Sequence, residues 1–224
     1  MSLRLLFIPA CTILFTAISC TKKPSTPPVV LPSDVPAYQE YYVTYNKTQN
    51  NTNAEAHLRL HNAAGDYIAL QNSDAILING QRPAYGVGNA MADVEFTFTR
   101  KDHTFRNKAS RSDIGDISFS ASTPSEIDKT HVATFSWDGP PLVFDEQVEL
   151  QFTGVNTGSY YSSSSMYVNG NTIVLDDRIL PKLDKGDYTM TLIRTVKLPL
   201  TQSDSTAGGI IYVNLRVEKV VTIK

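Results

Sequence analysis

The sequence predicts an all-β protein. Short runs rich in β-branched and aromatic residues follow one another along most of the chain, with Gly, Asn, Asp and Pro between them. Several runs alternate apolar and polar residues, as residues 147–152 do, and this pattern buries one face of a strand. Asn79-Gly80 and Asn169-Gly170 each follow an apolar run and indicate tight turns, because both residue types accept positive φ.

Each of these runs predicts one strand, bounded by the turn residues on either side. In chain order the expected strands are 38–45, 67–70, 75–78, 94–99, 117–120, 131–136, 147–152, 160–168, 172–175, 188–196 and 209–223. Segment 54–63 is ambiguous, since its Ala, Glu, Leu and Arg content also favours a helix. Leu58 and Leu60, two residues apart, favour a strand there.

The sequence motif that says most about the fold lies at residues 183–188. Leu183, Gly186 and Tyr188 resemble the Leu-x-x-Gly-x-Tyr pattern of the tyrosine corner in immunoglobulin-like Greek-key sandwiches. The resemblance implies such a β-sandwich from about residue 115 to the end, with the tyrosine hydroxyl bonded to upstream backbone. Segment 107–115 is polar and loop-like, which predicts two β-sandwich domains, at 37–113 and 114–224. One larger sandwich across both segments is the alternative.

The first twenty residues predict export and a lipid anchor. Arg4 precedes an apolar run too short to span a bilayer, which indicates a signal peptide over 1–19. Residues 16–20 resemble the lipobox of bacterial lipoproteins, which implies an acylated Cys20 as the first mature residue. Five prolines between residues 22 and 36 predict a disordered tether over 20–36.

Composition excludes several functions. The net charge of −2, with acids and bases mixed throughout, gives no basis for binding nucleic acid or an anionic lipid surface. Both cysteines, Cys11 and Cys20, lie in the expected signal or at its end, so the mature body has no disulfide, zinc-thiolate site or cysteine nucleophile. No Gly-x-Ser-x-Gly or Ser-x-x-Lys motif occurs, and we expect no catalytic residues and no cofactor.

We expect no metal site either. His57 and His61 would share one face of a helix, but on a strand they lie about 13 Å apart and cannot hold one ion. None of the acidic pairs has the spacing of a calcium loop.

Two groups of tyrosines are the candidate binding residues, because tyrosine offers an apolar ring and a hydroxyl for protein or glycan contacts. Tyr41 and Tyr42 represent the first group, and Tyr160 and Tyr161 the second. Trp137 is expected to pack in the core or against a turn and not to serve as a platform for a ligand.

Asp204-Ser205-Thr206 is similar to the O-glycosylation acceptor of exported Bacteroidetes proteins, which implies modification of Ser205. The lipobox, the tether and the β-strands together resemble the lipoproteins of that phylum with immunoglobulin-like domains.

The resemblance implies a non-enzymatic, outer-membrane lipoprotein, on the periplasmic face rather than the cell surface. It would bind or scaffold an envelope protein or a glycan. A fimbrial or adhesin subunit and an envelope hydrolase are the alternative functions.

Overall fold

The fold is described from a computed structural model of the 224-residue chain. The structure describes residues 29–30, 35–69, 75–82, 86–88, 90–100, 102–131, 133–143, 145–155, 160–166, 171–175 and 180–224. Strands account for nearly all regular structure in these residues, which confirms the all-β prediction. No helix among them is long and apolar enough to cross a membrane.

Sixteen strands and three short 3₁₀ helices make up the described part of the chain. The strands are β1 (Val29–Val30), β2 (Ala37–Asn46), β3 (Asn51–Leu60), β4 (Ile68–Ala69), β5 (Ala75–Ile78), β6 (Gly86–Gly88), β7 (Val94–Arg100), β8 (His103–Ala109), β9 (Ser118–Phe119), β10 (Glu126–Ile127), β11 (Ala133–Asp138), β12 (Gln147–Gly154), β13 (Tyr160–Met166), β14 (Thr172–Leu175), β15 (Gly186–Pro199) and β16 (Gly209–Ile223). The 3₁₀ helices are η1 (Arg111–Asp113), η2 (Leu180–Lys182) and η3 (Ser205–Ala207).

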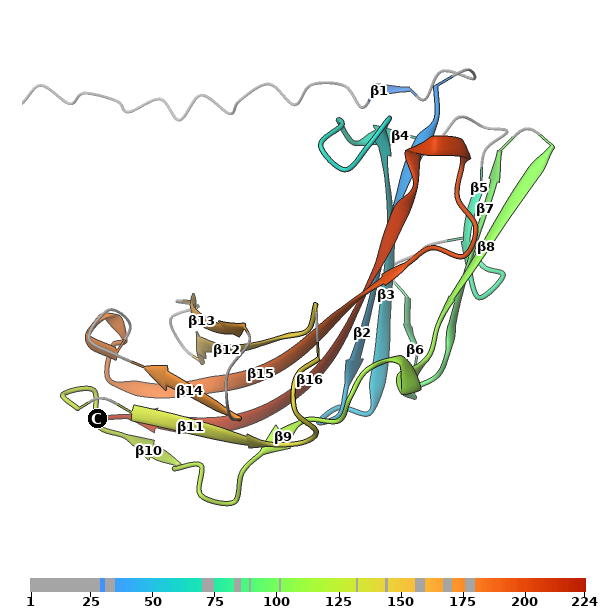
Figure 1. Ribbon diagram of the computed structural model, residues 1–224. Helices are drawn as coiled ribbons and strands as arrows, with labels where there is room; N and C mark the ends of the chain where they lie inside the picture. Colours follow the sequence, from blue (N-terminus) through green and yellow to red (C-terminus); the bar gives the residue numbers. More distant parts are fainter. Residues whose placement is uncertain are drawn as a thin grey trace, which may run out of the picture.

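One large sheet organises the molecule. Its strand order is β13-β12-β15-β16-β2-β3-β6, and β10 pairs with the end of β16. Two three-stranded sheets, β5-β7-β8 and β14-β11-β9, accompany it near its two ends, and the long strands β15 and β16 run between both (Figure 1). Strand β16 pairs antiparallel with β15 and parallel with β2. Chain segments far apart in sequence are therefore joined at the centre of the sheet.

Both small sheets pack on the same face of the large sheet. Register places Val148, Arg194, Leu215 and Tyr45 in one row across four neighbouring strands, and all four side chains are buried. Residues of this inward face meet β7 at one end and β11 at the other. The contacts are ring pairs: Tyr41 stacks on Phe96 at 4.3 Å, and Phe135 meets Phe152 edge-on at 6.4 Å.

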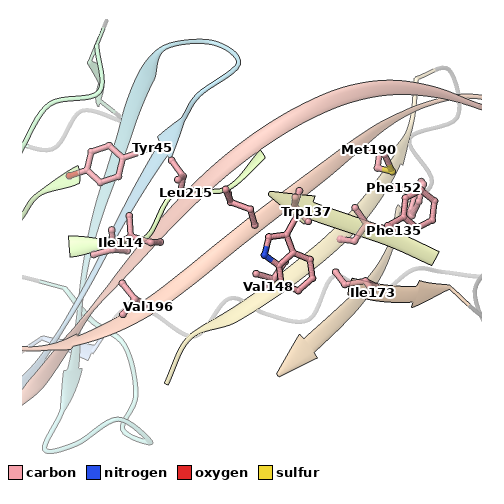
Figure 2. Packing of buried hydrophobic residues seen from close by; sticks show 14 of the residues in the cluster. Tyr45, Ile114, Phe135, Trp137, Val148, Phe152, Ile173, Met190, Val196 and Leu215 are labelled. Atoms are coloured by element: carbon pink, nitrogen blue, oxygen red, sulfur yellow. The ribbon is translucent and has the colours of Figure 1, made fainter. Parts of the chain in front are cut away.

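The core is one continuous cluster beneath the large sheet. Figure 2 shows Phe135 and Trp137 of β11 among Val148, Phe152 and Met190 of the large sheet. Trp137 is 2% exposed, so the expectation that it is a core residue is confirmed. A smaller cluster of Ala37, Leu58, Ile76 and Phe98 extends the core toward the β4 end.

A strand forms over most of segment 54–63. Strand β3 covers it up to Leu60, which confirms the strand interpretation against the helix. His61 follows with φ of 62°, so the backbone turns away at that point. Asn79 and Gly80 have φ of 51° and 77°, and the backbone of Ile78 and Gln81 pairs around them, as the tight-turn signal predicts.

The loop predicted over 107–115 is wrong at its start. Residues 107–109 belong to β8, which pairs along its whole length with β7. Most side chains of β8 are exposed or half-buried, so its sequence is as polar as that of a loop.

The expected boundary after Asp113 falls between the strands of the two covering sheets, with β7 and β8 before it and β9 and β11 after it. The large sheet crosses this boundary through the pairing of β2 with β16, and the main core cluster contains residues from both sides. The division into two domains stays a prediction.

Val29 and Val30 lie in the segment for which the sequence predicts a disordered tether. They form β1 and pair in parallel with Ile68 and Ala69 of β4. No local pattern indicates this pairing, because the partner strand lies almost forty residues further along the chain.

A buried guanidinium ties two loops to β15. Arg194 is 1% exposed and donates through Nε and Nη2 to the carboxylate of Glu146. Its other hydrogen bonds go to the backbone carbonyl oxygens of Asp116 at 3.3 Å, Pro140 at 2.8 Å and Pro141 at 3.1 Å. The buried charge thus has a counter-charge and a full set of acceptors, as a buried cation requires.

Candidate functional site

A group of aromatic and charged side chains lies on the outward face of the large sheet, opposite the core. Side chains alternate between faces along a strand, so Tyr38, Glu40 and Tyr42 point away from the inward Tyr41. Register then sets Tyr42 beside Tyr212 of β16. We call the whole group the tyrosine patch: Tyr38, Glu40, Tyr42, His57, Arg59, Tyr67, Lys197 and Tyr212.

The rings of the patch contact one another in a chain. Tyr42 and Tyr212 stack with centroids 4.9 Å apart and planes inclined by 11°. His57 meets the edge of Tyr42 at 5.7 Å and lies 5.6 Å from the ring of Tyr67. The ammonium of Lys197 stands 5.9 Å from the ring of Tyr212. Each of these four rings contacts at least one of the others, so their arrangement exists before any ligand arrives.

A salt bridge lies at the base of the patch. Glu40 is only 6% exposed although it is on the outward face. Its carboxylate accepts a hydrogen bond from Arg59 Nε at 2.9 Å. The Arg59 guanidinium also lies 3.7 Å from the centre of the Tyr67 ring and donates to the Tyr67 hydroxyl. Arg59 therefore links the carboxylate below to the exposed ring above.

This environment shifts the acid–base behaviour of the patch. Burial raises the pKa of Tyr42 well above its usual value, and a hydrogen bond to Glu40 adds to the shift. Burial likewise raises the pKa of Tyr38 and of Tyr212. The hydrogen bond to Glu40 raises the pKa of Arg59. The hydroxyls of Tyr38, Tyr42 and Tyr212 therefore stay protonated to a higher pH than those of exposed tyrosines.

The ring arrangement favours a protein ligand over a sugar. A sugar stacks on the open face of an aromatic ring, but Tyr42 and Tyr212 cover each other's faces. Arg59 covers one face of Tyr67 in the same way. Tyr67 is 53% exposed, so a ligand can contact its ring edge and its hydroxyl. Tyrosine and arginine held in this way are the residue types that dominate protein–protein interfaces.

The predicted binding tyrosines lie in different environments. Tyr42 belongs to the patch. Tyr41 is fully buried against Phe96, and its hydroxyl donates to the Gln39 side chain at 2.8 Å, so it has no surface to offer a ligand. Tyr160 and Tyr161 lie in β13, but their side chains are outside the described part of the structure.

The residues of the tyrosine-corner motif lie where β15 begins. The Tyr188 hydroxyl accepts a hydrogen bond from the backbone N–H of Asp184 at 3.0 Å, and Tyr188 and Leu183 are both buried. Gly186 has φ of 138°, a value that other residues rarely adopt. A hydrogen bond from the tyrosine to upstream backbone is what the motif leads one to expect.

Two predicted modification sites fall outside what can be described. Cys20 lies outside the described residues, and Ser205 lies in η3 with its side chain undescribed. The neighbouring carboxylate of Asp204 accepts hydrogen bonds from the backbone N–H of Ala37 at 2.9 Å and from Arg100. The acid of the proposed glycosylation motif therefore joins the β15–β16 loop to β2 and β7.

Metal-ligating side chains do not gather in the described part of the chain. No three His, Cys, Asp or Glu residues come close enough there to hold an ion. His57 is in the tyrosine patch beside Glu55, 3.5 Å away, and His61 lies beyond the end of β3.

Comparison with known proteins finds no match to the chain. No protein-family model matches it, and neither a curated protein nor a solved structure matches it.

Most of the tyrosine patch is absent from the sequence-based list of binding residues. Glu40, Arg59 and Tyr212 each occupy an outward position in an alternating strand, and this signal could have identified them one by one. Glu40 and Arg59 meet across the neighbouring strands β2 and β3. Tyr212 joins them only through the parallel pairing of β2 with β16, about 170 residues apart, which no local pattern predicts.

Proposed function

We propose that this protein is a non-enzymatic, lipid-anchored module of the cell envelope that binds another protein through the tyrosine patch. The observation that carries the proposal is the ordered stack of Tyr42 and Tyr212 beside the Arg59–Tyr67 pair. Such a surface loses little side-chain entropy on binding, because its rings are already fixed. The half-exposed rings supply contact area, and the hydroxyls supply directional hydrogen bonds.

The rest of the proposal comes from the sequence. Acylation of Cys20 would fix the chain to the outer membrane, with the body on the periplasmic face. The strand composition and the Tyr188 hydrogen bond support an immunoglobulin-like Greek-key sandwich. The absence of recognised catalytic motifs in the sequence supports a binding or scaffold role over a hydrolase.

Site-specific photo-cross-linking in living cells tests the proposal. A photoreactive phenylalanine analogue replaces Tyr67, whose ring it resembles, and in a second strain it replaces Val220. Val220 is 62% exposed and lies on the same outward face of β16, eight residues beyond Tyr212, so it is a matched control. We expect a discrete protein adduct at position 67 and none at position 220.

Two results would count against this function. Equal adducts at both positions would show that the cross-linking is non-specific. No adduct at either position would mean that the tyrosine patch does not bind a protein. An adduct that resists protease but yields to glycan-degrading enzymes would replace the protein ligand by a glycan.

A further inference from the structure

The pairing of β1 with β4 shortens the link between the proposed anchor and the folded body. Val29 stands nine residues after Cys20, whereas the first residue of the main sheet, Ala37, stands seventeen residues after it. A fully extended chain spans at most about 3.4 Å per residue. The link therefore reaches no more than about 31 Å if β1 is paired, and about 58 Å if it is not.

The shorter of these two link lengths is less than the length of the body, and the longer one exceeds it. Strand β16 has 15 residues and extends from one end of the body to the other, about 46 Å at roughly 3.3 Å per residue (Figure 1). A 58 Å link would allow either end of the body to meet the membrane. A 31 Å link attached at the β4 end is shorter than the body, so the body cannot stand upright on its far end.

The tyrosine patch lies in the half of the body that carries this attachment. Tyr67 directly precedes β4, and its backbone pairs with that of Arg59. Tyr212 is the fourth residue of β16, counted from the β4 end, while β10 pairs with the last residues of that strand. Figure 1 shows β1 and β4 at one end of the molecule and the C-terminus at the other.

We infer that β1–β4 pairing turns the β4 end of the body toward the membrane and presents the tyrosine patch to proteins embedded in, or lying on, that membrane. This inference rests on the proposed lipid anchor at Cys20. It narrows the partner from any envelope protein to one within reach of the bilayer surface.

Energy transfer to the bilayer tests this orientation without any partner. The full-length precursor is expressed in a bacterial host, and the mature protein is reconstituted into nanodiscs that contain an acceptor dye on lipid headgroups. A fluorescent amino acid replaces Ala64, exposed in the turn before β4, or Ser125, exposed beside Thr222 at the far end. We expect clearly higher transfer from position 64 than from position 125.

Two link variants serve as controls. The double substitution Val29→Pro and Val30→Pro removes both backbone N–H donors of β1, and a twenty-residue Gly/Ser insert after residue 28 lengthens the link. Both should abolish most of the difference in transfer between positions 64 and 125.

Equal transfer from the two positions in the native protein would overturn the inference, as would a difference that survives the proline substitutions. If the protein fails to enter nanodiscs, it carries no lipid anchor, and the inference is then wrong as well. The cross-link at position 67 is measured separately, so failure of the binding function is distinguishable from failure of the orientation.

Discussion

Replacing the buried cation Arg194 by methionine should destabilise the protein more than any surface change. Methionine is close to arginine in length and fills much of the same space, so the change removes charge and hydrogen bonds rather than packing. Arg194→Met leaves the Glu146 carboxylate buried, with its side chain 4% exposed. In the described part of the chain, the Glu146 carboxylate then keeps one hydrogen bond, donated by the backbone N–H of Val143 at 3.0 Å.

The size of the effect follows from these contacts. Breaking a buried ion pair by removing one partner costs about 3–5 kcal/mol. Three backbone carbonyl groups also lose a donor, and each unmet buried acceptor adds up to about 1 kcal/mol. We therefore expect a loss of about 5 kcal/mol, comparable with the whole stability of many domains. The double variant Arg194→Met with Glu146→Met buries no charge and should regain most of that loss.

Urea unfolding followed by fluorescence measures both variants. Trp137 is the single tryptophan of the chain and is buried in the same core, so its emission reports loss of the fold. A loss below about 1 kcal/mol in Arg194→Met would refute the reasoning, because the buried pair would then be expendable. A double variant as unstable as the single one would refute it as well.

Three further predictions concern other parts of the body. Gly115→Ala should lower the free energy of unfolding in urea by about 1–3 kcal/mol, because an added Cβ would stand 2.6 Å from Cζ of the immobilised Arg194. An unchanged unfolding midpoint would contradict this expectation. Tyr188→Phe removes the acceptor of the Asp184 N–H and should cost about 1 kcal/mol, whereas a neutral result would mean that the hydrogen bond does not stabilise the turn. The pKa of Asp128 is lowered to about 2, because its carboxylate accepts hydrogen bonds from the hydroxyl and the backbone N–H of Thr130. A carbon NMR titration of Asp128 should therefore show a midpoint near pH 2 and not near pH 4. Because the folded pKa is the lower one, this contribution to stability is present above pH 4 and is lost as the pH falls toward 2.

Local sequence patterns predicted the strands well because each depends on residues that are neighbours in the chain. Expected strands 75–78, 172–175 and 209–223 match β5, β14 and β16 to the residue. Strand β8 was missed because its outward residues are polar and the buried inward residue Asn107 is polar as well, so the sequence shows no clear alternation. Strand β1 was missed because two valines in a proline-rich segment carry no strand signal of their own.

The binding surface was predictable only in part. Tyr41 and Tyr42 are adjacent on a strand, so the alternation rule already implied that only one of them points outward. The rule also marks Tyr212 as outward, between the buried Ile211 and Val213. The sequence could not show that the two outward tyrosines stack, since this depends on a parallel pairing between its two ends.

One substitution shows whether the stacked tyrosines bind a partner. Tyr212→Thr removes the ring that stacks on Tyr42 but keeps a β-branched residue on the strand, so the fold should survive with a loss of about 1 kcal/mol. Val220→Thr, on the same face of the same strand, is the matched control. We expect Tyr212→Thr to lower the yield of the position-67 cross-link in intact cells at least tenfold, and Val220→Thr to leave it unchanged. An unchanged yield in a folded Tyr212→Thr protein would mean that the stacked tyrosines do not bind the partner.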